Sequence, residues 1–89
     1  MVKTPMLVPT LEAEDYCLIM HNRPSDDYDV IKGNETIGRI RVRLKCVKAN
    51  TGTEISYVPY DIDINVVDGS TDMPIDLFKK LIMATVTVS

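Results

Sequence analysis

A strict alternation of charged and apolar residues over positions 39–45 is the clearest pattern in the chain, which there has the sequence Arg-Ile-Arg-Val-Arg-Leu-Lys. Successive side chains of a β-strand point to opposite faces of a sheet. The pattern therefore predicts a strand in which Ile40, Val42 and Leu44 face a core and the cations face solvent.

Other short segments of the chain also have the features of strands. Residues 28–31 precede the alternating segment and are joined to it by Lys-Gly-Asn-Glu, where Gly and Asn supply the positive φ of a hairpin turn. Residues 16–20 form an apolar run that ends in a cluster of turn residues, which predicts a buried strand. A further strand is predicted over 54–66, and Pro59 within it indicates a bulge or an edge position, because proline has no N–H for a sheet ladder.

The C-terminal part of the chain has the spacing of a helix. Apolar residues recur one helical turn apart, at Ile75, Phe78, Leu81 and Ile82. Thr71 or Asp72 is expected to cap this helix, with Pro74 in its first turn. The β-branched tail, residues 85–88, fits either a last strand or a disordered end.

These elements predict a single domain over residues 1–89, in which 1–15 is an extended N-terminal arm. The expected fold class is α+β, a small antiparallel sheet of four or five strands with one amphipathic helix near the C-terminus. The predicted core is made by two alternating strands and the helix: Ile40, Val42, Leu44, Ile62, Ile64, Phe78, Leu81 and Ile82.

Composition agrees with a folded domain. The chain has 89 residues, of which 45% are hydrophobic, and a net charge of −3, which excludes the disordered class. No apolar run approaches the ~20 residues that span a bilayer, so no membrane association is expected. The first residues lack the apolar core of a secretory signal, which predicts a cytoplasmic protein. Cys17 and Cys46 are expected to be reduced and buried, because each lies in an apolar stretch.

The cations are concentrated in one part of the chain. Alternate residues of a strand are about 6.6 Å apart, close to the ~7 Å between successive phosphates of an extended nucleic-acid strand. The candidate partner-binding residues, called the cationic row below, are Arg39, Arg41, Arg43 and Lys45. The row is expected either to pair with acids of a neighbouring strand, such as Asp61 and Asp63, or to bind an acidic partner. The pI near 4.9 and the lack of interleaved aromatic residues favour an acidic protein over nucleic acid.

No catalytic or metal site is predicted. His21 is the one imidazole of the chain, which excludes sites built from several histidines. Cys17 and His21 would lie about 13 Å apart along a strand, too far for proton transfer. No nucleotide or cofactor motif is present, so no cofactor is expected.

The sequence thus predicts a small non-enzymatic protein-binding module, such as an inhibitor, adaptor or accessory subunit. It would act through a sheet edge or through the basic strand face, and an acidic protein surface or a second copy of the chain is the expected partner. Two alternatives remain open. One is a nucleic-acid-binding module that uses Arg39–Lys45, and the other is a minimal enzyme, which no motif supports.

Overall fold

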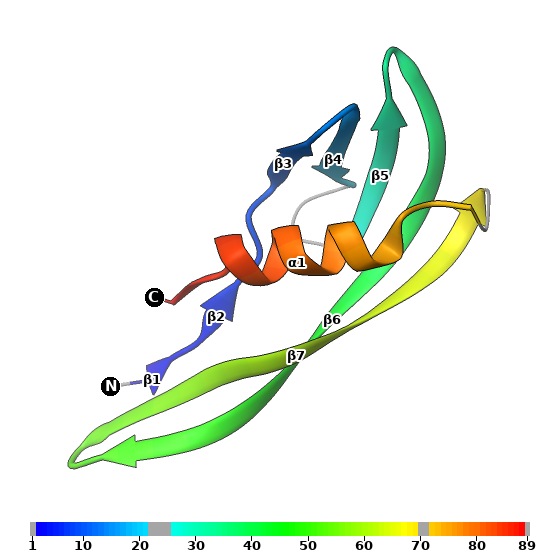
Figure 1. Ribbon diagram of the computed structural model, residues 1–89. Helices are drawn as coiled ribbons and strands as arrows, with labels where there is room; N and C mark the ends of the chain where they lie inside the picture. The colour runs from blue at the N-terminus through cyan, green and yellow to red at the C-terminus, as the bar shows by residue number, and fades with distance from the viewer. Residues whose placement is uncertain (1, 22–25, 70–71, 89) are drawn as a thin grey trace.

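The computed structural model describes residues 2–21, 26–69 and 72–88, which form a curled main sheet crossed by a single helix and a separate two-stranded sheet (Figure 1). The strands are β1 (Val2–Lys3), β2 (Pro5–Met6), β3 (Thr10–Ala13), β4 (Tyr16–Met20), β5 (Asp27–Lys32), β6 (Glu35–Thr51), β7 (Glu54–Gly69) and β8 (Thr87–Val88), and the helix is α1 (Ile75–Thr85). Six strands form the main sheet in the order β1-β7-β6-β5-β4-β3, while β2 and β8 pair separately.

The expected antiparallel sheet of four or five strands is wrong, because the main sheet has six strands and is mixed. Val2 and Lys3 pair in parallel with Ile55 and Ser56 of β7, and β3 pairs with β4. The C-terminal tail is also a strand, since Thr87 pairs with Met6. The strand is one of the two alternatives left open for this tail. β1 and β2 escaped prediction because a segment of two residues has no period of its own, and a distant partner fixes its conformation.

The core confirms much of the predicted set. Ile40, Val42, Ile62, Phe78 and Ile82 are buried, and Leu44, Ile64 and Leu81 are partly buried against them. The structure adds five buried residues that the prediction lacked, namely Leu11, Leu18, Tyr28, Val30 and Met73.

Tyr28 is fully buried although acidic residues stand on both sides of it in the sequence. Its phenol donates a hydrogen bond to the Val8 carbonyl, which satisfies the buried hydroxyl. Its side chain and those of Asp27 and Asp29 point to opposite faces of β5, so the two carboxylates share the outer face of the sheet.

Helix α1 crosses the concave side of the sheet and lies near β3 and β7 (Figure 1). The N-cap is Pro74, and no side chain caps the helix, so the expected cap by Asp72 is wrong. Thr71, the other expected cap, lies outside the described residues. The ring of Phe78 meets that of Tyr16 edge to face, with centroids 5.4 Å apart, and this contact fixes the helix to β4.

Strands β6 and β7 are far longer than the rest, with 17 and 16 residues. Their joined ends project beyond the helix and beyond β3, β4 and β5, with β1 paired along β7, and the molecule measures 48 × 21 × 21 Å (Figure 1). This projecting ribbon, residues 46–59, is called the arm below. It begins at a bulge in which Tyr60 is the extra residue, next to Pro59, as the proline predicted.

Candidate functional site

The outer face of the sheet pairs two arginines of the cationic row with acids of β5. Arg39 is the Cα partner of Asp29, and Arg41 is the Cα partner of Asp27. In each pair the arginine Nε lies 3.0 Å from a carboxylate oxygen. Asp29 also lies 3.2 Å from Nδ1 of His21, so its carboxylate contacts both Arg39 and His21. At this end the row and β5 are complementary in charge.

Lys45, at the other end of the cationic row, is paired through β7. Its Nζ lies 3.3 Å from Asp63, and this carboxylate raises the pKa of the lysine. The hydrogen bond from Arg41 in turn lowers the pKa of Asp27 below its ordinary value. Lys45 and Asp27 therefore hold their charges more firmly, and much of the positive charge of the row is compensated within the chain.

Arg43 differs from the other three residues of the row. It is exposed, and within the described residues it forms no ion pair. Its Cα partner on β7 is Asp63, whose carboxylate lies by Lys45 instead. On its other side Arg43 has no partner in β5, because that strand begins at Asp27, which lies opposite Arg41. Arg43 is thus the one cation of the row that has no carboxylate in the described structure.

Beyond the end of β5, no described strand pairs with this side of β6. The Val42 N–H donates to the Asp26 carbonyl at 2.8 Å, and the described residues make no further bond of this kind along β6. Backbone groups of alternate residues in an antiparallel sheet point to the same edge. The N–H and C=O groups that point outward beyond this bond belong to Leu44, Cys46, Lys48 and Asn50. This edge, residues 43–51 of β6, is called the free edge below.

The alternation continues past the bulge. The register shifts between Lys45 and Cys46, and β7 supplies the extra residue, so β6 itself keeps its period. Val47 and Ala49 are opposite Val58 and Ser56 and bond to β7. The outward groups of the free edge consequently take no part in the β6–β7 ladder.

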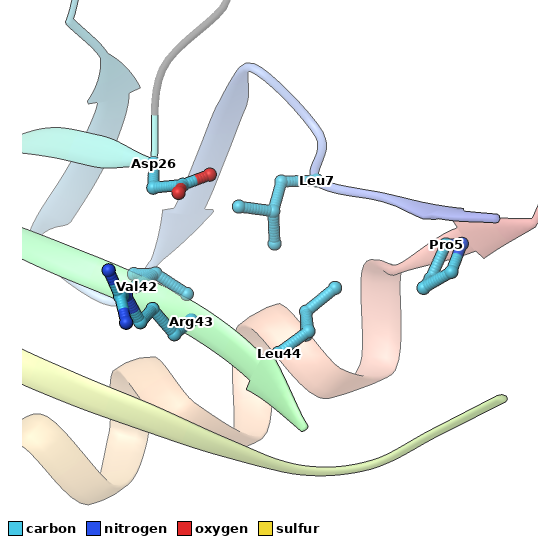
Figure 2. Close-up of a pocket in the computed structure, with 6 residues that line it drawn as sticks. All are labelled: Pro5, Leu7, Asp26, Val42, Arg43 and Leu44. Carbon is cyan, nitrogen blue, oxygen red and sulfur yellow. The ribbon is translucent and has the colours of Figure 1, made fainter. Parts of the chain in front are cut away.

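A pocket of about 250 Å³ opens beside the start of the free edge (Figure 2). Its lining residues are Pro5, Leu7, Asp26, Val42, Arg43 and Leu44. Leu7 lies across the pocket from Leu44, and the Asp26 carboxylate points into the space between β5 and Leu7 (Figure 2). The site thus combines unused backbone groups, an apolar floor, one carboxylate and the unpaired guanidinium of Arg43.

The sequence predicted Arg43 as a candidate but gave no sign of the pocket. Leu7 and Asp26 were not singled out, because one lies in the N-terminal segment and the other in a cluster of turn residues. The cluster of turn residues before Asp27 was the one available signal, because it limits the length of β5. It could have indicated that β6 extends past the end of β5.

The arm exposes apolar side chains. Val47 and Val58 are Cα partners, 52% and 46% exposed, and Tyr60 at the base of the arm is 61% exposed.

Both cysteines are free thiols, as predicted, but Cys46 is exposed and Cys17 only partly buried, so the expected burial is wrong. The apolar stretch around Cys46 continues β6 beyond the core, where no layer covers it.

Among residues 2–21, 26–69 and 72–88, no group of three or more His, Cys, Asp or Glu side chains is placed to hold a metal ion. The described helix is too short and insufficiently apolar to cross a bilayer.

Comparison of the chain with protein-family models, with curated proteins and with solved structures found no match. Function is therefore inferred from the geometry of the chain itself.

Proposed function

We propose that this protein is a small non-enzymatic protein-binding module that adds a strand of its partner to the free edge. The observation that carries the proposal is the difference in length between neighbouring strands. β5 ends at Asp27, opposite Arg41, whereas β6 runs on to Thr51. A strand edge of this length is a template for pairing with another chain.

The backbone supports this mode of binding. The outward N–H and C=O groups of Leu44, Cys46, Lys48 and Asn50 are available to an added strand. Each such hydrogen bond replaces one with water, so its net contribution is modest, about 0.5 to 1.5 kcal/mol. Several of them in register nevertheless give affinity without depending on the sequence of the partner.

The pocket supplies selectivity at one end of the edge. A side chain opposite Leu44 would point to the face of the sheet that carries the pocket, toward Leu7 and Val42. Burying an aliphatic side chain there contributes roughly 1.5 to 3 kcal/mol relative to exposure. In strand addition, main-chain hydrogen bonds generally give the affinity and pockets for side chains give the specificity.

The nucleic-acid alternative has less support. A row that tracks phosphates needs several uncompensated cations, because each neutralised phosphate contributes to affinity. Arg39, Arg41 and Lys45 each have a carboxylate within 3.3 Å. Arg43 alone is a weak basis for binding a polyanion.

The proposal can be tested by removing one outward N–H from the free edge. Cys46→Pro removes the N–H that points outward and leaves the ladder to β7 intact, because the N–H of Cys46 points away from β7 and its Cα partner there, Pro59, has no N–H to donate. Cys46→Ser is the matched control, since it changes the side chain and keeps the N–H. Each variant would be immobilised beside the wild type and incubated with a lysate of the cells that make the protein, with circular dichroism to verify folding.

Proteins that bind the wild type and Cys46→Ser but not Cys46→Pro would support strand addition. Proteins captured equally by all three would contradict it, because binding would then not involve the outward N–H of Cys46.

A further inference from the structure

We propose that the segment bound at the free edge carries acidic residues in alternation with apolar ones. This inference rests on the proposed function and adds the chemistry of the partner. It follows from the way in which β5 complements the first part of the cationic row.

β5 is a strand already bound to β6, and its outer face shows which side chains fit the row. It places Asp29 opposite Arg39 and Asp27 opposite Arg41, each in an ion pair at 3.0 Å. These acids are two residues apart, as the period of a strand requires. A strand that continues the line of β5 would bring its next outward side chain opposite Arg43.

Arg43 is therefore the position at which the partner is expected to carry an acid. The Cα partner of Arg43 on β7 is Asp63, but the carboxylate of Asp63 pairs with Lys45. An Asp or Glu in the partner would therefore supply the carboxylate that Arg43 lacks. The Arg43 guanidinium is exposed, so an ion pair with the partner removes little water from either charged group and costs little free energy of desolvation. Opposite acid and base in a cross-strand pair also favour one register over its neighbours.

The partner residue that directly precedes the acid is expected to be apolar. In a strand that runs as β5 does, this residue stands opposite Leu44 and enters the pocket of about 250 Å³ whose other walls include Pro5, Leu7 and Val42. The Asp26 carboxylate points into this pocket (Figure 2), so an acid on the pocket side would be repelled. Acids are thus favoured on the outer face and excluded from the inner one.

A second copy of the chain is a poorer occupant than another protein. The free edge carries Arg43, Lys45 and Lys48, so two such edges would bring cations together. The segments of the chain that alternate acidic and apolar residues, 27–30 and 61–64, are already paired inside the sheet. The partner is therefore inferred to be an extended segment of a different protein.

Short synthetic peptides with blocked ends test the inference. One alternates Asp and Val, a second has Lys in place of Asp, and a third has the composition of the first with its acids placed together. Binding to the full chain would be measured by fluorescence anisotropy at about 50 mM and about 300 mM salt. We expect the alternating acidic peptide to bind most tightly, with an affinity that falls as salt rises.

Two arginine variants separate the role of Arg43 from that of general charge. Arg43→Gln is expected to weaken the alternating acidic peptide about two- to five-fold, the range of an exposed ion pair. Arg41→Gln removes the same charge two residues away, but Arg41 is already bonded to Asp27, so it should weaken peptide binding less than Arg43→Gln does. Thermal denaturation of both variants would verify that each is folded.

The outcomes distinguish this inference from the proposed function. Equal binding of the acidic and the Lys peptides, or equal effects of the two arginine variants, would overturn the inference. Strand addition would still stand if Cys46→Pro abolished that binding. A dimer in light scattering that Cys46→Pro dissociates would make a second copy the occupant, which also overturns the inference. Failure of all peptides, together with no effect of Cys46→Pro on captured proteins, would overturn both proposals.

Discussion

Gly38 in β6 and Gly69 at the end of β7 are Cα partners that approach too closely for either to carry a side chain. A Cβ on Gly38 would lie 2.6 Å from the carbonyl oxygen of Asp68, and one on Gly69 would meet the carbonyl oxygen of Ile37. Gly69 also has a φ of +101°, a conformation that other residues rarely adopt. This close contact lies at the end of the β6–β7 ladder that is farthest from the tip of the arm.

Gly69→Ala is expected to lower the free energy of unfolding by more than about 2 kcal/mol, because it adds a backbone clash to an unfavourable φ. The matched control is Gly52→Ala in the turn at the tip of the arm. Gly52 has a φ of +62° but no atom near its added Cβ, so its cost should be about 1 kcal/mol. Urea denaturation of both variants measures the difference. Equal losses would show that the close approach of Gly38 and Gly69 is unimportant.

Glu14, in the turn between β3 and β4, has a φ of +54°, which is unfavourable for a residue with a side chain. Glu14→Gly is expected to stabilise the protein by about 0.5 kcal/mol, since relief of this strain exceeds the entropy lost by glycine on folding. Glu12→Gly in β3 is the control and should destabilise, because it weakens a strand at a position without such strain. A lower melting temperature for Glu14→Gly would contradict the turn geometry.

Burial of Tyr28, with the nearby charge of Asp26 as a second cause, raises the pKa of the phenol to about 12 from an ordinary value of 10.0. The folded protein therefore keeps this proton at pH values where the unfolded chain loses it. The associated stability is fully present below about pH 10 and is lost as the pH rises toward 12. The loss should amount to roughly 2 to 3 kcal/mol.

Tyr28→Phe tests this titration. At neutral pH the variant should be less stable by about 1 kcal/mol, because the hydrogen bond to the Val8 carbonyl is lost. Its stability should then fall less steeply than that of the wild type between pH 10 and 12. Denaturant titrations across this range supply the comparison. Parallel curves for the two proteins would mean that Tyr28 does not titrate as a buried phenol.

Parts of this fold could be predicted because their signals are local. The alternation around Val42 and the helical spacing of Phe78 each identify a buried face without reference to any distant residue. Tyr28 was missed as a core residue because its neighbours Asp27 and Asp29 make the segment polar, although they lie on the opposite face. β1 was missed because Val2–Lys3 become a strand only through pairing with β7.

The candidate site was predictable only in part, for a similar reason. The sequence gives the order of cations along β6, but the pairing of each depends on which neighbour lies beside it. Arg41 and Arg43 are equivalent in the sequence pattern, yet one faces Asp27 and the other lies beyond the end of β5. The pocket depends on Leu7, which reaches this place through the pairing of β2 with β8.

The two thiols should differ in reactivity, because Cys46 is exposed on the arm and Cys17 is partly buried in β4. Under native conditions iodoacetamide is expected to modify Cys46 first, and mass spectrometry of peptide fragments identifies the site. Modification in a denaturant, where both thiols are exposed, is the control and should be equal. Faster native modification of Cys17 would indicate that the arm packs on another surface.

Amide hydrogen exchange at single-residue resolution is the most direct test of strand addition at the free edge. In the unbound protein the N–H groups of Leu44, Cys46 and Lys48 should exchange faster than those of Lys45 and Val47, which bond to β7. On binding of the alternating Asp and Val peptide or of a captured partner, the three outward amides should become protected while the other two change little. Protection that appears elsewhere in the chain, with the three outward amides still exchanging fast in the complex, would contradict the proposal.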